Sequence, residues 1–270
     1  MVVFLSEDGE VKLRAIFLLF NVLMILLLFF VLIVSSFIPN RSEIVAVGNV
    51  WIILLVLSVG ILDFYFIQNW RLLSLLEAEN WPGLLAWLEN RLHVKRRLNR
   101  VYSSLLISTA LSVSKLDAIK KLEVEIRQKR PKLRRSLGVA LGIPILLEQD
   151  REAIARYYGP LADDPKTKQR DWAIWCRAAT LGRGKIDQLM RLLGSRDISL
   201  RLLSWEILKQ RSRYLSDAEL DVLAKSRVEL KNLLNESRGD KMLRKSRENY
   251  LISLVLSSQV DRVKSDLLAS

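Results

Sequence analysis

Residues 15 to 38 read AIFLLFNVLMILLLFFVLIVSSFI, 24 residues without a charged side chain. Because a helix rises about 1.5 Å per residue, this stretch is about 36 Å long and exceeds the roughly 30 Å apolar core of a bilayer. A cleaved signal peptide has a shorter apolar stretch, of about 7–15 residues, and a small-residue cleavage site. No such site follows here. We therefore predict a membrane-spanning helix over residues 15–38.

A second apolar stretch covers residues 44–67 and carries one charge, Asp63. Only five residues separate the two stretches, too few to cross back over a bilayer, so we expect an antiparallel hairpin. Basic residues flank the outer ends of this hairpin, whereas its loop holds only Arg41. The excess of Lys and Arg marks cytoplasmic segments, so both termini are expected in the cytoplasm. The predicted divisions are a short N-terminus over 1–14, a hairpin over 15–69 and a cytoplasmic basic helical domain over 70–270.

Two polar residues lie inside the predicted spans at similar depth, Asn21 and Asp63. A hydrogen bond between them would satisfy both groups and fix the register of the hairpin. The alternative is an ion or proton site, since acids inside a membrane are costly and tend to be functional. We favour the structural pairing, because two spans with one acid make a poor transporter.

The remaining chain is soluble in composition and strongly basic. Residues 1–70 hold three basic and five acidic side chains, and residues 71–270 hold 39 and 24, which together give the net charge of +13. One cysteine and one histidine exclude a disulfide framework and a Cys/His zinc cluster. Phosphate-loop, dinucleotide-binding and nucleophile-elbow motifs are absent from the sequence. We expect no cofactor, no metal and no enzymatic activity.

Beyond Trp70 the apolar residues recur at spacings of three and four, which predicts helices throughout. Proline and glycine indicate helix ends at Pro82, Pro131, Pro144, Gly159-Pro160, Pro165, Gly182–Gly184, Gly194 and Gly239. Ser216 and Glu219 have the spacing of a capping box. Gly138 and Gly142 form a small-xxx-small pattern that predicts close helix packing. The sequence therefore indicates an all-α protein with helices of roughly 10–20 residues.

A weak repeat runs through this region, with Leu84, Ile119, Ile154 and Leu189 each 35 residues apart. Each lies in a candidate first helix, and a second helix follows at 98–111, 133–147, 166–181 and 198–211. Trp81-x-x-Leu84 matches the start of the W-x-x-L-G-x-x-Y pattern, although Leu85 and Leu88 replace its Gly and Tyr. The region resembles the tetratricopeptide repeat (TPR) family, with a generic right-handed helical solenoid as the other interpretation. The resemblance implies a peptide-binding concave surface and no catalysis.

Trp172, Trp175 and Trp205 lie on apolar faces of these helices. They are candidates for anchors in a partner groove, but we favour core packing, since each neighbours other apolar positions. Cys176, which adjoins Trp175, is expected to be a small buried apolar residue.

Basic residues concentrate in clusters that offer a second kind of site. The first two clusters comprise Arg91, Lys95, Arg96, Arg97 and Arg100, and Arg127, Lys129, Arg130, Lys132, Arg134 and Arg135; a third runs from Arg238 to Arg247. Three interpretations are open. The clusters can form a solvated face that fixes the orientation of the chain in the membrane, a contact for anionic lipid or an acidic protein, or a nucleic-acid contact. The nucleic-acid reading is the weakest, because no aromatics interleave with the charges.

These patterns favour a membrane-anchored scaffold or adaptor that binds a protein partner, or copies of itself, at the cytoplasmic face of a membrane. By analogy, such a scaffold serves as an assembly part of an envelope or motility complex. The alternative is a membrane-anchored electrostatic binder of anionic lipid or nucleic acid. A small channel built from the hairpin is a third reading. A bacterial inner membrane fits the short loop best, with the endoplasmic reticulum and mitochondrion as other locations.

Overall fold

The computed structural model describes residues 19–27, 29–30, 33, 42–94, 98–180 and 185–269, without the side chains of residues 42–55, 237 and 238. Every regular element among these residues is helical, which confirms the all-α class. The chain divides into two compact units, Met1–Trp87 and Leu88–Ser270, which are described separately.

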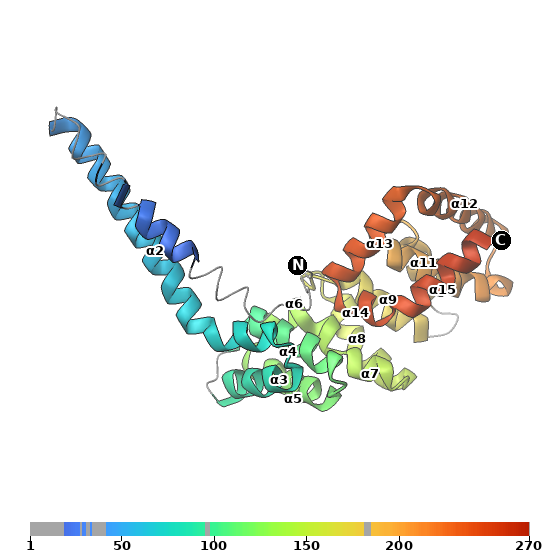
Figure 1. Cartoon of the computed structure of the whole chain (residues 1–270). Coiled ribbons are helices and arrows are strands. Elements are labelled where there is room, and N and C mark those ends of the chain that lie inside the picture. Colours follow the sequence, from blue (N-terminus) through green and yellow to red (C-terminus); the bar gives the residue numbers. More distant parts are fainter. Residues whose placement is uncertain are drawn as a thin grey trace. The chain divides into compact units, whose positions relative to one another are not determined.

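The first unit contains one long helix, α2 (Ser42–Glu77; Figure 1). Its 36 residues give a length of about 54 Å at about 1.5 Å per residue. Within the described residues, no helix combines the length and the apolar composition needed to cross a membrane. Much of the predicted span 15–38 lies outside the described residues, as do the side chains of residues 44–55 in the second predicted span.

The helices that follow α2 are shorter and are joined by brief turns (Figure 1). Their bounds are α3 (Trp81–Glu89), α4 (Arg100–Ser112), α5 (Leu116–Lys129), α6 (Pro131–Leu141), α7 (Ile143–Leu147), α8 (Arg151–Asp163), α9 (Arg170–Thr180), α10 (Ile186–Leu192), α11 (Ile198–Gln210), α12 (Asp217–Asn235), α13 (Ser237–Asn249), α14 (Leu251–Val255) and α15 (Ser257–Ala269), with a π-helical turn η2 (Asn90–Val94) and a 3-10 turn η4 (Ser212–Tyr214).

Most helix boundaries fall where proline and capping residues predicted them. Pro131 lies at the start of α6, and the break before Pro144 separates α6 from α7. At the start of α12, the Ser216 hydroxyl accepts a hydrogen bond from the Glu219 amide at 3.4 Å. The Glu219 carboxylate in turn accepts one from the Ser216 amide at 2.7 Å. The predicted capping box is therefore confirmed.

Two predicted breaks are wrong. Helix α8 continues through Gly159 and Pro160 to Asp163. Pro160 lies in the last turn, so the hydrogen bond that it cannot donate is lost only at the end of the helix. Gly239 lies inside α13, and the break falls at Glu236 instead. A Cβ at Gly239 would lie 2.5 Å from the Leu233 carbonyl oxygen, so this glycine allows α13 to approach α12 closely.

Close packing between α6 and α8 confirms the reading of the small-xxx-small pattern. A Cβ at Gly142 would lie 2.5 Å from Tyr157 Cε1 and 2.6 Å from the Tyr158 hydroxyl oxygen. Both rings are held in place, because Tyr157 donates to the Gly138 carbonyl at 3.0 Å and Tyr158 to the Val139 carbonyl at 3.1 Å. Glycine is thus required where α6 passes these rings.

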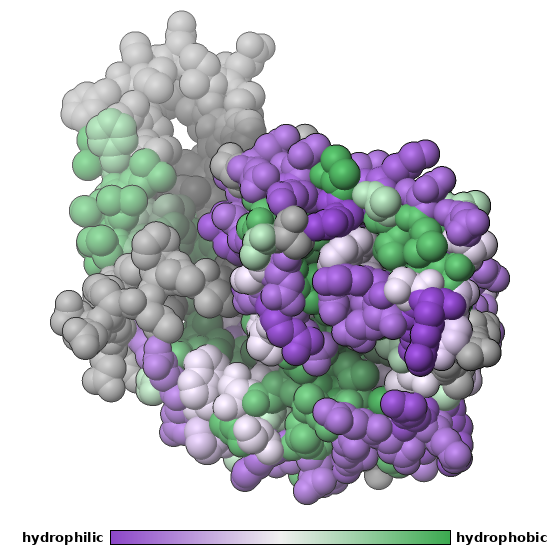
Figure 2. Space-filling model, turned by 90° about the vertical axis from the view of Figure 1, so that its right-hand side faces the viewer, coloured by the Kyte–Doolittle hydropathy of each residue, from purple (hydrophilic) through white to green (hydrophobic). Residues whose placement is uncertain are grey.

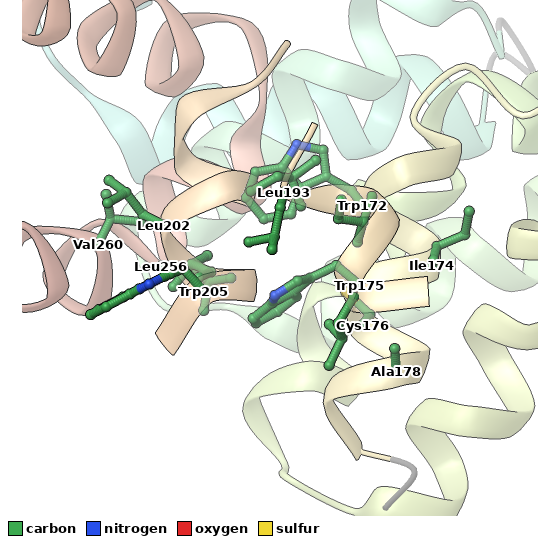
Figure 3. Packing of buried hydrophobic residues seen from close by; sticks show 14 of the residues in the cluster. Trp172, Ile174, Trp175, Cys176, Ala178, Leu193, Leu202, Trp205, Leu256 and Val260 are labelled. Carbon is green, nitrogen blue, oxygen red and sulfur yellow. The ribbon is translucent and has the colours of Figure 1, made fainter. Parts of the chain in front are cut away.

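The core of the second unit gathers apolar side chains from α6 and from α8 through α15 (Figure 3). Trp172, Trp175 and Trp205 are exposed by only 1%, 5% and 3%, and all three belong to this core. Cys176 is completely buried beside them. The face drawn in Figure 2 is largely hydrophilic, with several patches of hydrophobic side chains among the polar ones. All three tryptophans therefore pack in the core, and Trp172 also lines a surface hollow that is described below.

Candidate binding site

The most promising site is a surface depression, here called the notch, where the first turn of α9, the turn before α11 and the end of α13 meet. It consists of two adjoining hollows of about 330 and 440 Å³. Both hollows are lined by Arg196, Asp197 and Tyr250. The other lining residues are Ile198, Met242, Lys245, Ser246 and Asn249 in the first, and Lys168, Gln169, Arg170, Asp171, Trp172, Gly194, Ser195 and Leu200 in the second.

Asp197 organises the floor of the notch. It is the N-cap of α11, where its carboxylate accepts a hydrogen bond from the Ser199 amide at 3.0 Å. The same carboxylate accepts from the Trp172 indole N–H at 2.9 Å and from the Ser246 hydroxyl at 2.6 Å. Both carboxylate oxygens are therefore engaged, so Asp197 serves to hold α9, α11 and α13 together.

A chain of buried hydroxyl groups continues from Asp197 into the core. The Ser246 hydroxyl oxygen lies 2.9 Å from that of Ser253, and the Ser253 oxygen lies 3.0 Å from that of Ser199. All three serines are buried. Because buried polar groups are costly when unpaired, a closed chain of this kind favours one arrangement of α11, α13 and α14. The floor of the notch is consequently rigid.

Tyr250 forms the aromatic wall shared by the two hollows. It is half-buried at the junction of α13 and α14, and its ring centroid lies 6.3 Å from that of Trp172. Burial, and then the negative charges of Asp197 and Asp171, raise the pKa of the Tyr250 hydroxyl. The phenol is therefore neutral at physiological pH, and it offers a hydrogen-bonding group on an apolar ring.

The rim of the notch is basic. Lys168, Arg196 and Lys245 are exposed there. Within the part of the chain that the structure describes, none of the three forms an ion pair or a side-chain hydrogen bond. The other lining cation, Arg170, donates from Nε to the Ala162 carbonyl at 2.8 Å. The notch can therefore bind and orient an anionic group with three side chains that have no anion of their own.

The second predicted basic cluster is partly neutralised, because four of its six residues lie near three acids of the same unit. In α5, Arg127 lies 3.9 Å from Glu123, and Lys129 lies 3.3 Å from Glu125. Two further ion pairs connect different elements: Arg134 lies 3.7 Å from Glu123, and Arg135 lies 3.0 Å from Asp164. Arg130 and Lys132 are exposed. Of the six basic residues that the sequence places here, four lie within ion-pair distance of an acid, and two of these, Arg134 and Arg135, join α6 to α5 and to the end of α8.

The first predicted cluster is placed only in part. Lys95, Arg96 and Arg97 lie outside the described residues. The Arg91 guanidinium stacks over the Tyr102 ring at 4.9 Å, and Arg100 is exposed at the start of α4. These positions do not bring Arg91 or Arg100 into the notch, since neither lines it.

The predicted polar pair of the hairpin stays a prediction. Asp63 Oδ1 is buried and has no hydrogen-bond partner among the described residues. Asn21 lies in a helical segment of the same unit, and it makes an interaction of its own. In the described part of the chain, no group of three or more His, Cys, Asp or Glu side chains is placed to hold a metal ion.

Sequence reasoning missed the notch because its residues are far apart in the chain. Lys168, Arg196 and Lys245 come from three segments, and only Lys245 fell in a predicted basic cluster. A local signal was nevertheless present. Gly194-Ser195-Arg196-Asp197 before the apolar start of α11 is a turn with an N-cap residue at its end. It places an exposed cation directly beside a capping carboxylate.

The family comparison covers the part of the chain that contains the notch. The family model described as "Uncharacterised Treponema protein" matches residues 118–267. A protein of Treponema pallidum (strain Nichols), described as "Uncharacterized protein", is 29% identical over 124 residues, which are 45% of this chain and 40% of that protein. The chain thus matches less than half of that relative's length. No solved structure matches the chain.

Proposed function

We propose that this chain, which belongs to the family described as "Uncharacterised Treponema protein", is a membrane-anchored helical scaffold that binds a protein partner. In this proposal residues 15–38 and 44–67 form the anchor, and both termini lie in the cytoplasm of a bacterium. The helices after α2 form TPR-like pairs that carry the binding surface. The observation that carries the proposal is the notch, an open depression with an unneutralised basic rim on a rigid floor.

The exposed apolar surface of the first unit supports the anchor. Phe64, Tyr65 and Ile67 on α2 are exposed by 64%, 61% and 70%, and Leu19 and Phe29 are exposed to a similar degree. Soluble monomers rarely leave apolar surface of this extent in contact with water. A lipid environment would cover these side chains. The excess of basic residues after residue 70 supports the cytoplasmic placement.

The regular burial of the repeat positions supports the scaffold. Leu84, Ile119, Ile154 and Leu189 are all buried, and each lies in a helix that is followed by a second one. Stacked helix pairs bury a continuous core and expose an extended face, which is the usual basis of partner binding by helical repeats. Tethering to a membrane raises the effective concentration of such a face for partners on the same membrane.

Fractionation and cross-linking test the proposal together. The full chain is expected to stay with membranes after alkaline carbonate extraction. It is also expected to retain a defined protein partner after cross-linking in native membranes and washing at high salt. Release of the chain by carbonate would refute the anchor, and the absence of any retained protein would refute the scaffold.

An electrostatic binder of anionic lipid or nucleic acid is the second candidate function. Arg130 and Lys132 favour it, because both are exposed at the α5–α6 junction beside residues whose charge is already paired. This function predicts partners that high salt removes, since phosphate contacts are strongly salt-dependent. It also predicts that Arg130→Glu with Lys132→Glu abolishes binding, whereas a salt-tolerant protein partner would favour the scaffold.

A further inference from the structure

We infer that the notch binds a short acidic segment of the partner, with two or more carboxylates on the basic rim and one apolar side chain against Tyr250. This inference rests on the proposed scaffold function and specifies the chemistry of its partner.

The distribution of charge in the notch selects an anion. The lining has four basic residues, with Lys168, Arg196 and Lys245 on the exposed rim. It has two acids, Asp171 and Asp197. Asp197 is engaged by three internal hydrogen bonds, and the exposed Asp171 accepts one from the Ser195 hydroxyl at 3.5 Å. Both keep their charge, so four basic residues against two acids leave an excess of two positive charges in the lining. The groups still free to pair with a ligand are therefore mostly positive.

Basic residues on α5 and α6 are of two kinds, some paired with an acid of the same chain and some, such as Arg130 and Lys132, exposed without an ion pair among the described residues. Arg127, Lys129 and Arg135 each have an acid of the same chain within ion-pair distance. The three rim residues of the notch have none among the described residues. Charged groups arranged to complement a partner steer its approach and fix its register. The rim is thus a basic surface that an acidic partner would find unoccupied, and unlike Arg130 and Lys132 it borders two hollows.

The walls of the notch are partly apolar, which favours a ligand with an apolar side chain next to its carboxylates. Tyr250 is shared by both hollows, and Met242 is half-buried in the first one. Trp172 and Leu200 lie beneath the second hollow. Aromatic and apolar surface of this kind is the usual anchor point at protein interfaces. A purely polyanionic ligand would leave this surface uncovered.

The size of the hollows favours a short peptide segment over a broad face of a folded domain. Their volumes, about 330 and 440 Å³, lie in the range that accepts compact ligands or single side chains. The hollows adjoin at Arg196 and Tyr250, so one extended segment can place side chains in both. The fixed Asp197 network keeps the two hollows in register, which reduces the entropy lost on binding.

Selection from a random peptide library tests the inference. The full chain in non-ionic detergent is used to select short displayed peptides, and individual peptides are then measured by fluorescence anisotropy. We expect the selected pool to be enriched in Asp and Glu next to Leu, Phe or Tyr. The double variant Arg196→Glu with Lys245→Glu is expected to weaken binding by about tenfold or more, because attraction at the rim becomes repulsion.

A matched variant controls for net charge. Lys121→Glu with Lys225→Glu changes the total charge by the same amount at exposed positions on α5 and α12 that do not line the notch. Peptide binding should stay within about twofold of the original, because distant surface charges contribute little. Equal loss in both double variants would overturn the inference, as would a selected pool without acidic residues. A single-stranded oligonucleotide or an anionic vesicle is also added as a competitor. If it displaces the peptides from the chain with Arg196 and Lys245 but not from the double variant, the notch binds phosphate groups and the acidic-segment inference is overturned.

The two proposals fail in different ways. If a partner is retained in native membranes equally well by the Arg196→Glu with Lys245→Glu variant, the scaffold stands and its acidic-segment site is refuted. If the unaltered chain retains no protein partner at all, the scaffold function itself is refuted.

Discussion

Replacing Asp197 by alanine should loosen the whole core of the second unit. The change removes the N-cap of α11, which costs about 1 kcal/mol. It also leaves the buried Trp172 indole N–H without an acceptor, at about 1–2 kcal/mol. Ser246 keeps a partner in Ser253 and adds little. The free energy of unfolding of this unit should therefore fall by about 2–3 kcal/mol.

Cys176 provides a native probe for this loss. It is the one cysteine in the sequence, it is completely buried in the same core as Trp172, and burial raises the pKa of its thiol. A thiol reagent therefore labels it through opened molecules. When opened molecules reclose faster than the reagent reacts, the labelling rate of Cys176 follows the population of opened molecules. A loss of about 2–3 kcal/mol in the free energy of unfolding should then make labelling about 30- to 150-fold faster, since about 1.4 kcal/mol is a factor of ten.

Asp197→Asn is the matched control. Asparagine remains a good N-cap and keeps one oxygen acceptor, so labelling of Cys176 should accelerate by only about tenfold or less. If Asp197→Ala changes the labelling rate by less than about threefold, the hydrogen-bond network contributes little to the core, and the claim of a rigid floor is incorrect. Asp197 uses one carboxylate oxygen for the N-cap and the other for the Trp172 indole, so an asparagine that keeps the cap cannot also accept from the indole. Equal effects of the two substitutions would therefore show that the N-cap contributes little.

The other predictions concern packing, protonation and capping. Gly142→Ala should lower the free energy of unfolding by about 1–3 kcal/mol in urea unfolding, because the new Cβ would collide with two anchored tyrosine rings. Gly194→Ala is the control: its Cβ would have its nearest contact at 3.6 Å, so the free energy of unfolding should change by no more than about 0.5 kcal/mol. Burial raises the pKa of Glu125, but the hydrogen bonds and charges of His93 and Lys129 together lower it by more, so its pKa lies below the ordinary value. The ionised Glu125 therefore stabilises the fold above the ordinary carboxyl pKa of 4.5, and this stabilisation is lost as the pH falls below that value. Glu125→Gln should reduce the loss of stability at acid pH in a stability–pH profile. An unchanged profile would refute the stabilising role of Glu125. Ser216→Ala should cost about 1 kcal/mol and increase amide exchange in the first turn of α12, and unaltered exchange there would contradict the capping box.

Local rules predicted the helices well because each boundary depends on residues that are adjacent in the chain. The Ser216 capping box and the helix start at Pro131 needed no tertiary information. Gly159-Pro160 failed because a proline in a last turn removes only a terminal hydrogen bond, and whether that turn forms depends on its surroundings. Propensity alone could not decide this case.

The notch could not be predicted because its chemistry depends on which charges find partners. The cluster from Arg127 to Arg135 looked stronger in the sequence than Arg196 alone. Folding neutralises much of the former with Glu123, Glu125 and Asp164 and leaves Arg196 exposed. Counting cations in a sequence therefore overestimates a surface whose acids lie on neighbouring helices.

Site-specific photo-cross-linking in native membranes tests the central claim most directly. A photoreactive phenylalanine derivative placed at Asn249, an exposed residue of the notch, is compared with one at Gln128, an exposed residue of α5 outside it. The proposed scaffold predicts one defined protein adduct from position 249 that stays in carbonate-washed membranes, and no such adduct from position 128. No protein adduct at position 249, or the same adducts from both positions, would contradict the assignment of the notch as the partner site.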